Sequence, residues 1–215
     1  MKKIGQGQSA NVFKNNKTGY ARKHSYTNNL SFEFAIIKLI HDVVPDGVVN
    51  PRKLNGPRVL IMNFVKDANK KINLQTIKKV LKTLITIQKK FPSFRQNDLY
   101  KENVFNEKMG DFGLASMSGL RNPVVVSGVF EESHGIGNKT SSKYDAHLFL
   151  NSIYVASDTP KKIKKIIERI YPSDYLGHDT DKIKNYRLRY SVDHSKLPSS
   201  KKILDIIINN EQQTD

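Results

Sequence analysis

The first 65 residues alternate between apolar and polar positions in short runs, as β-strands do when one face is buried. The predicted strands are residues 4–14, interrupted by a glycine turn, residues 20–24 and residues 58–65, with one further short strand near 47–49. Residues 31–40 follow a different pattern, because Phe32, Ile36 and Ile40 recur at helical spacing. We therefore expect a small antiparallel sheet with a single helix.

Beyond residue 70 the apolar residues recur every three or four positions, which indicates helices. The predicted helices are residues 74–91, ended by Pro92, residues 143–155, residues 160–171 after a Thr159-Pro160 cap, and residues 197–208. The first has one broad apolar stripe with lysines opposite, whereas the second is apolar on most sides, as a buried helix is. Residues 171–190 should be irregular and residues 209–215 a frayed tail. The predicted fold class is α+β.

Composition narrows the class of protein. The chain has 215 residues, enough for one domain or two closely packed lobes, and no cysteine, which excludes disulfides and thiolate metal sites. No cluster of His, Asp and Glu has zinc spacing, and His147 is expected to be a packed core residue. We find no signal peptide, no apolar run of membrane-spanning length and no glycine at position 2 for myristoylation. We expect an intracellular, cytoplasmic protein with no membrane partner.

The formal net charge is +16, and most of it comes from lysines spread through the whole chain. A solvated surface is sufficient to explain any single run of charges. A total this large nevertheless favours acidic partners, such as nucleic acid, phosphorylated protein or acidic substrate segments.

The candidate chemistry lies between residues 96 and 113. Asp98 precedes Asn103 by five residues, and an Asp-Phe-Gly triplet begins at Asp111. Two tiny strands, 104–105 and 108–110, would form a hairpin that holds Asn103 and Asp111 close together. Phosphoryl transfer needs a carboxylate near the attacking hydroxyl, for which Asp98 is suitable, and oxygen ligands for Mg²⁺, for which Asn103 and Asp111 are suitable. Each motif alone arises by chance, but their order and spacing together do not readily do so.

This arrangement resembles the catalytic loop and the metal-binding loop of the eukaryotic-type protein-kinase family. The resemblance extends to the N-terminal strands, where Gly5, Gly7 and Val12 match a glycine-rich loop that lets backbone amides approach phosphate. Ala10 stands in the place of the third glycine. A plain hairpin with a glycine turn would explain the same residues.

Further matches follow in the family's order. Ala21 and Lys23 resemble the motif whose lysine reaches the α- and β-phosphates, and Glu33 would pair with that lysine. Lys23 could instead be a surface lysine, and Glu33 a helix N-terminal acid favoured by the dipole. Met62 resembles the residue beside adenine, and the backbone at 63–65 would bind its edge. The ATP-binding residues that the resemblance implies are Ile4, Gly5, Gly7, Ala10, Val12, Ala21, Lys23, Glu33, Met62, Asn63, Phe64 and Val65.

The catalytic loop departs from the family in three places. Gln96 replaces a His or Tyr, and Asn97 replaces the arginine that grips a phosphorylated activation loop, so we predict activity without phosphorylation of that loop. Tyr100 replaces the lysine that offsets charge on the γ-phosphate, and Lys101 is the candidate substitute. The catalytic residues implied are therefore Asp98, Lys23 and Lys101.

Two acids have structural roles in the resemblance. Asp145, at the start of the buried helix, would accept hydrogen bonds from the catalytic-loop backbone, although a simple helix N-terminal charge is the alternative. Residues 114–132 would form a short activation segment with a strand at 124–126. Glu132 would anchor this segment by pairing with Arg187 or Arg189, although surface ion pairs are common.

The resemblance implies a two-lobed protein-kinase-like fold with an N-lobe over residues 1–65 and a trimmed, mainly helical C-lobe over residues 66–215. It implies a monomeric kinase that uses ATP and Mg²⁺ to phosphorylate protein hydroxyls, chiefly Ser and Thr. The chain is short for this family, as are the small protein kinases of large DNA viruses, which it resembles in this respect. For such a viral protein the host cytoplasm or the virion would be the location. Two alternatives stay open: a small-molecule phosphotransferase of the same fold, and a non-catalytic, basic docking or nucleic-acid-binding protein.

Overall fold

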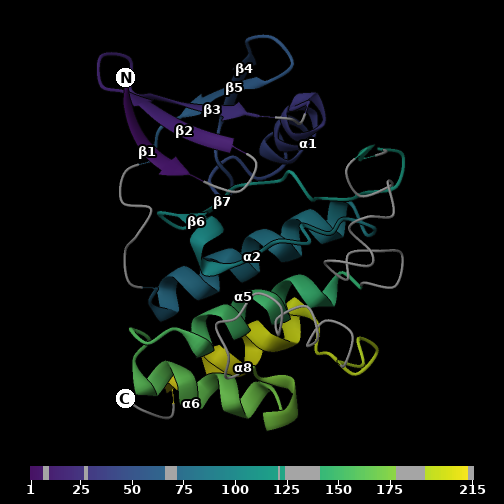
Figure 1. Ribbon diagram of the computed structural model, residues 1–215. Coiled ribbons are helices and arrows are strands. Elements are labelled where there is room, and N and C mark those ends of the chain that lie inside the picture. The colour runs from purple at the N-terminus through teal and green to yellow at the C-terminus, as the bar shows by residue number, and fades with distance from the viewer. Residues whose placement is uncertain are drawn as a thin grey trace.

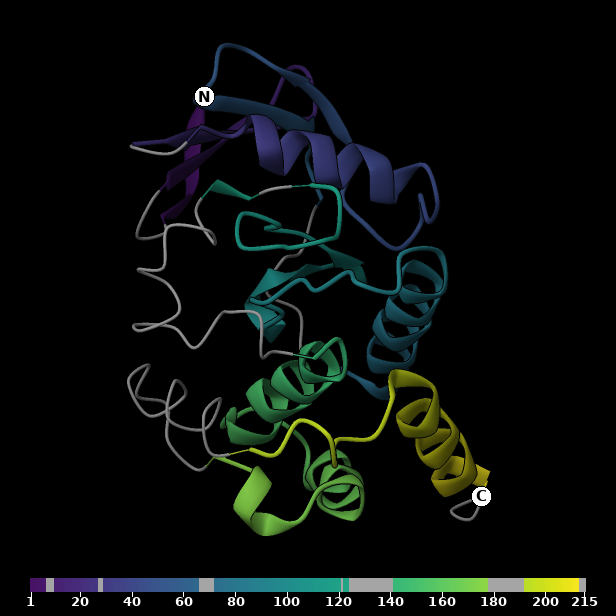
Figure 2. The same cartoon turned by 90° about the vertical axis from the view of Figure 1, so that its right-hand side faces the viewer.

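The computed structural model is an α+β molecule in which an antiparallel sheet is followed along the chain by helices (Figure 1). It describes residues 1–6, 10–26, 29–65, 72–120, 122–123, 141–177 and 192–212. The sheet lies at one end of the molecule with the N-terminus, and the C-terminus lies among the helices at the other end (Figure 2). The predicted fold class, α+β with the sheet first, is confirmed.

The sheet has five strands in the order β1-β2-β3-β5-β4, and each neighbouring pair is antiparallel. The strands are β1 (Lys2–Gln6), β2 (Ala10–Asn15), β3 (Tyr20–Ser25), β4 (Pro51–Leu54) and β5 (Val59–Asn63). Alternation is clearest in β3, where Ala21, Lys23 and Ser25 are buried and the residues between them are only half-buried. Helix α1 (Ser31–His41) packs beside the sheet and buries Ile36, Ile37 and Ile40.

The short strand expected near residues 47–49 was wrong, because the strand of this region is β4 at 51–54. The backbone of residues 47–49 bonds elsewhere: the amide of Met109 donates to the oxygen of Gly47 at 2.8 Å, and the amide of Val49 donates to Met109 at 3.0 Å. Val48 therefore forms an isolated parallel bridge to Met109 instead of extending the sheet.

The helical part contains α2 (Leu74–Lys90), α5 (Lys143–Val155), α6 (Lys161–Ile170) and α8 (Ser200–Gln212), with 3-10 turns η1 (Lys101–Asn103) and η2 (Ser173–Tyr175). Asn73 caps α2, since its side chain accepts the amide of Thr76 at 2.8 Å. α5 is buried on every side from Tyr144 to Ile153, as its sequence predicts. His147 belongs to this core and is fully buried, with Nε2 2.7 Å from the oxygen of Tyr175.

Two details of the helices differ from the prediction. Thr159 does not cap α6; its hydroxyl donates instead to the oxygen of Ile153 at 2.6 Å, near the end of α5. Residues 209–212, expected to fray, continue α8. They do so because Glu211 pairs with Lys78 of α2 at 2.8 Å and Asn210 accepts a hydrogen bond from Arg169 of α6.

A single apolar core extends from α1 through α2 and α5 to α8. The link between the sheet and α2, residues 66–71, lies outside the described residues, as do the strand predicted at 124–126 and most of the irregular stretch 178–190. No helix in the described part of the chain combines the length and the apolar character needed to cross a membrane.

Candidate active site

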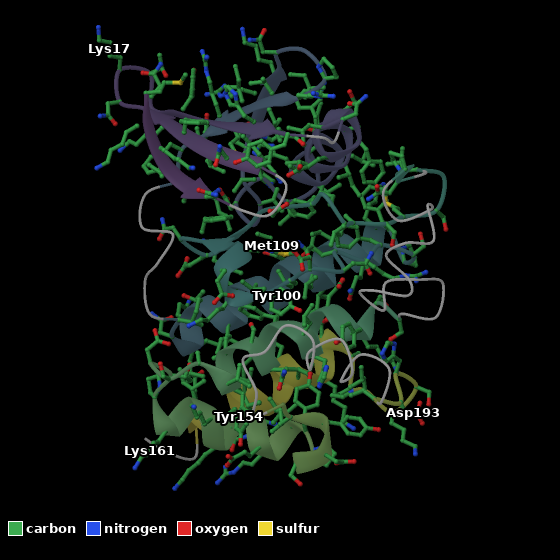
Figure 3. The ribbon with its side chains drawn as sticks, viewed as in Figure 1. Lys17, Tyr100, Met109, Tyr154, Lys161 and Asp193 are labelled. Carbon is green, nitrogen blue, oxygen red and sulfur yellow. The ribbon has the colours of Figure 1, made fainter. Side chains whose placement is uncertain are left out.

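Three of the predicted site residues, Lys23 on the sheet, Glu33 on α1 and Asp111, meet between the sheet and the helices. The hairpin of β6 (Val104–Phe105) and β7 (Lys108–Met109) lies at this level, below the sheet and above α5 in Figure 1. Tyr100 and Met109, labelled in Figure 3, mark the same middle layer of the molecule. The site is therefore formed by segments from both parts of the fold.

Lys23 is the meeting point of two acids from distant segments. Its Nζ lies 2.9 and 3.0 Å from the two carboxylate oxygens of Glu33 on α1, and 2.7 Å from Oδ1 of Asp111. Lys23 and Glu33 are buried, with 9% and 3% exposed surface, whereas the Asp111 side chain is 45% exposed. The ion pair expected between Lys23 and Glu33 is present, and Asp111 joins it from the open side.

The electrostatics follow from one ammonium shared by two carboxylates. Burial tends to lower the pKa of Lys23, because it disfavours the charged form. The negative charges of Glu33 and Asp111 outweigh this effect and hold the pKa of Lys23 above its usual value. Burial also raises the pKa of Glu33, and the Lys23 charge does not fully offset it. Partial burial also tends to raise the pKa of Asp111, but the Lys23 charge and the hydrogen bond from the Gly113 amide outweigh this effect, so the pKa is lowered. Asp111 is therefore an ionised carboxylate facing partly open space.

Asp98 and Asn103 are joined directly. The Asn103 Nδ2 donates to the backbone oxygen of Asp98 at 2.7 Å and to its carboxylate at 3.1 Å, and the backbone oxygen of Asn103 accepts the amide of Gly110 at 2.9 Å. The predicted two-strand hairpin is confirmed, with Asn106 and Glu107 at φ of 47° and 67° in its turn. This hairpin connects the Asp98–Asn103 loop to the Asp111 loop.

The backbone at 110–112 is tightly constrained. A Cβ on Gly110 would lie 2.6 Å from the ring of Phe105, so any other residue there would force that ring to move. Asp111 has φ of 51°, a left-handed conformation that costs about 1 kcal/mol or more for a non-glycine residue. Phe112 is fully buried beside Phe94, with ring centroids 6.4 Å apart. Packing and neighbouring hydrogen bonds thus hold Asp111 in a conformation that it would rarely adopt alone.

The oxygen atoms present suit Mg²⁺. The Asn103 Nδ2 is used by Asp98, so its Oδ1 is the atom suited to binding a metal, and Asp111 presents a 45% exposed carboxylate whose Oδ1 also contacts Lys23. Within the described ranges no group of three or more His, Asp and Glu residues could hold a metal by itself. Mg²⁺ is commonly bound by one or two protein oxygens together with substrate phosphates, so this small donor set fits that ion.

The residues predicted to surround adenine lie side by side on the sheet. Val12 is opposite Lys23, and Ala21 is opposite Met62 in the β3–β5 pair. Ala10 is buried at the start of β2 and Ile4 is 44% exposed on β1, while Gly5 pairs with Val12. Gly7 lies outside the described residues.

Two of the three backbone amides at 63–65, which were expected to bind adenine, are hydrogen-bonded within the protein. The amide of Asn63 donates to the oxygen of Asn50 at 2.9 Å, and the amide of Phe64 donates to Gly19 at 3.0 Å. Both amides are therefore engaged within the protein. Of the three amides in this stretch, that of Val65 is the one we expect to reach a ligand.

Lys101 is directed to a different partner from the one that the resemblance implies. Its Nζ pairs with Asp158 at 3.0 Å, and its amide donates to the hydroxyl of Ser152 at 2.9 Å. The 3-10 turn η1 carries Lys101 toward the end of α5 and the turn that follows it. In this geometry Lys101 stabilises the connection between η1 and the helices.

Asp145 supports the start of the Gln96–Asn103 loop. Its two carboxylate oxygens accept the amides of Gln96 at 2.8 Å and Asn97 at 2.9 Å, and the residue is 1% exposed. The contact expected of Asp145 is thus present. Glu132 and its predicted partners lie outside the described residues.

The sequence indicated Gln96 only as a replacement at a structural position of the loop, and not as a link between two loops. Its Nε2 donates to the oxygen of Asp111 at 2.7 Å, and its Oε1 accepts the amide of Asp98 at 2.6 Å. One buried side chain therefore connects both functional loops. The only available signal was its place beside Asp98 in the motif, whereas Asn122, which also contacts this region, gave none.

Comparison with known proteins gives one distant similarity. A protein of Acanthamoeba polyphaga mimivirus named "Putative serine/threonine-protein kinase R400" is 21% identical to the chain over 178 residues. The alignment covers 63% of this chain and 38% of that protein, so the chain spans well under half of the relative's length. No family model matches the chain. The similarity is partial and is compatible with a viral protein-kinase-like relative.

Proposed function

We propose that the chain is a protein kinase that transfers the γ-phosphate of ATP to protein Ser and Thr hydroxyls with Mg²⁺. The observation that carries the proposal is the convergence on Lys23, which bonds to residues 10 and 88 positions away in the sequence. An accidental set of motif matches has no reason to bring Lys23, Glu33 and Asp111 together. The name of the mimivirus relative supports the choice of Ser and Thr.

The proposed fold is kinase-like, with a small lobe over residues 1–65 and a larger lobe over residues 66–215. Lys23 binds phosphate oxygens of ATP, and Asp98 accepts the hydrogen bond of the attacking hydroxyl and orients it. Asn103 and Asp111 hold Mg²⁺, which offsets the negative charge of the phosphates. The neighbouring side chains of Val12, Ala21 and Met62, with the Val65 amide, receive adenine.

The partner is proposed to be a protein substrate with acidic segments or one associated with nucleic acid, and the chain itself a monomer. The support is the net charge of +16 together with the lysines on the exposed face of α6. Activity is proposed not to depend on phosphorylation of the activation segment, because Asn97 stands where an arginine would bind that phosphate. Phosphatase treatment should leave the rate of transfer unchanged.

The test is Mg²⁺-dependent transfer of labelled γ-phosphate to the protein itself, to a basic mixed substrate and to an acidic one. Wild type should label protein, Asp111→Asn should not, and Asp205→Asn on the exposed face of α8 should behave as wild type. Nucleotide binding without labelled protein would replace the proposal with a small-molecule acceptor. Absence of Mg·ATP binding, with salt-sensitive binding of nucleic acid, would leave the docking protein.

A further inference from the structure

We propose that Asn122 is a positioning residue for Asp111, acting with Gln96 and Asn97 as a clamp of neutral carboxamides that fixes residues 110–116 without a phosphate. We call these three side chains the carboxamide clamp. The catalytic consequence rests on the proposed function, whereas the structural consequence does not.

Asn122 supplies the contacts that the motif does not contain. Its Nδ2 donates to the oxygen of Gly113 at 3.0 Å and to the oxygen of Ala115 at 2.8 Å. The two carbonyls precede it by nine and seven residues, so Asn122 closes a loop on the segment that leaves Asp111. Asn122 is 2% exposed, and a buried carboxamide is strongly held to its hydrogen-bond partners because leaving them unpaired is costly.

Gln96 and Asn97 donate further hydrogen bonds to the same segment. Gln96 Nε2 reaches the oxygens of Gly110 at 3.3 Å and Asp111 at 2.7 Å, and Asn97 Nδ2 reaches the oxygen of Leu114 at 2.8 Å. Both donors are buried, with 0% and 3% exposed surface. The clamp therefore donates hydrogen bonds to carbonyls both before and after Gly113.

The remaining carbonyl of this segment is bonded within it. The oxygen of Phe112 accepts the amide of Ala115 at 3.0 Å. With the clamp in place, every carbonyl from residue 110 to residue 115 has a donor. Asn97 also donates to the hydroxyl of Ser116 at 3.0 Å, which extends the fixed segment by one residue.

The clamp is joined to Asp98 as well as to Asp111. Gln96 Oε1 accepts the amide of Asp98 at 2.6 Å, and the amides of Gln96 and Asn97 rest on Asp145. A displacement of the segment at Asn122 would therefore alter the separation of Asp98 and Asp111. Misplacement of reacting groups by about 1 Å can reduce a rate by about 100-fold.

Carboxamides carry no charge and do not titrate, so the clamp needs no phosphate and is not weakened by salt. Asn122→Asp tests it with little change of volume, because the carboxylate loses both N–H donors and faces two carbonyl oxygens. Asn209→Asp on the exposed face of α8 is the matched control, with the same chemical change. Asn122→Ser is the milder second variant if Asn122→Asp does not fold.

Two measurements apply to the full chain: amide hydrogen exchange across residues 110–120, and the Mg²⁺ concentration for half-maximal phosphotransfer. In Asn122→Asp we expect faster exchange at the amides of Ala115 and Ser116, no change in α5, a higher Mg²⁺ requirement and kcat/KM lower by about 10- to 100-fold. Asn209→Asp should match wild type in each.

Unchanged exchange at residues 110–116 would overturn the clamp. So would an activity loss with an unchanged Mg²⁺ requirement and faster exchange throughout α5, since that describes general destabilisation. If wild type neither binds Mg·ATP nor transfers phosphate, the proposed function fails, and the exchange comparison alone then decides whether the clamp exists.

Discussion

The two sides of the candidate site hold Asp111 by different means. On the sheet side a charge does so: Lys23 lies 2.7 Å from the Asp111 carboxylate and also pairs with Glu33. On the helical side neutral hydrogen bonds do so, from Gln96 to the Asp111 backbone and from Asn97 and Asn122 to the residues that follow. The charged contact holds the functional group, whereas the neutral contacts hold the main chain that carries it.

Exposure explains the division. The Asp111 side chain is 45% exposed, so solvent or a ligand can compensate its charge, whereas the three carboxamides are at most 3% exposed. A charge buried without compensation is costly, and a carboxamide meets the same geometric need with a smaller desolvation penalty. Asp145 is the exception on the helical side, and its carboxylate is compensated by two amides.

Removing the charge on the sheet side should have the largest effect. In Lys23→Met, ATP would lose the ammonium that the proposed function assigns to its phosphates, and Glu33 is left buried beside Asp111. We expect phosphotransfer to fall by about 100- to 1,000-fold and the pKa of Glu33 to rise further. Initial rates at saturating Mg·ATP are the measurement, with Lys82→Met on the exposed face of α2 as control. A rate within tenfold of wild type would remove Lys23 from the proposed mechanism.

Breaking the charged support on the helical side should act mainly on stability. Asp145→Ala leaves the buried amides of Gln96 and Asn97 without their acceptor, so we expect the free energy of unfolding to fall by about 2–4 kcal/mol. Denaturant unfolding measures it, with Asp205→Ala on exposed α8 as the matched change. Equal stability of the two variants would show that the loop does not depend on Asp145.

The preference for neutral groups in the buried interior extends to His147. Burial lowers the pKa of His147 to about 4. Its ring contacts those of Tyr144, Tyr171 and Tyr175, and its Nε2 contacts the oxygen of Tyr175, while His194 stacks on Tyr144. The unfolded chain takes up a proton below about pH 6.5, while the folded chain does not until about pH 4. The contribution of His147 to the free energy of unfolding is therefore complete above pH 6.5. It declines by about 3 kcal/mol as the pH falls toward 4.

The variant His147→Gln isolates that effect. Its free energy of unfolding should depend less steeply on pH between about 6.5 and 4 than that of wild type. Urea titrations at several pH values provide the comparison. Parallel pH profiles for the two proteins would contradict the assignment, whatever their difference in absolute stability.

The smallest effect should come from the exposed ion pair of Lys101 and Asp158. Its side chains are 25% and 48% exposed, so a double-mutant cycle with Lys101→Met and Asp158→Asn should give a coupling of about 0.2–1 kcal/mol. Phosphotransfer measured on the same variants adds a second result. A severe loss of phosphotransfer in Lys101→Met, with no loss in Asp158→Asn, would support the role of Lys101 in offsetting charge on the γ-phosphate.

Much of the fold was accessible from local pattern. The span 143–155 of the buried helix, the amphipathic helix from residue 74 and the hairpin at 104–109 were predicted closely, because apolar periodicity and turn residues act over a few positions. The end of α8 was not predicted correctly, since residues 209–212 remain helical through contacts with α2 and α6. Sequence spacing cannot show such a contact across 133 residues.

The candidate site divides in the same way. The sequence by itself determined which groups are available: Lys23, Glu33, Asp98, Asn103 and Asp111, each of a residue type suited to phosphate or Mg²⁺. Only the tertiary structure decided which partner each side chain in this region has. Lys101 pairs with Asp158, and Asn122 donates to the carbonyls of Gly113 and Ala115. The physical reason is that a side chain's chemistry is local, whereas a hydrogen bond requires two groups within about 3 Å, and the packing of the whole chain sets that distance.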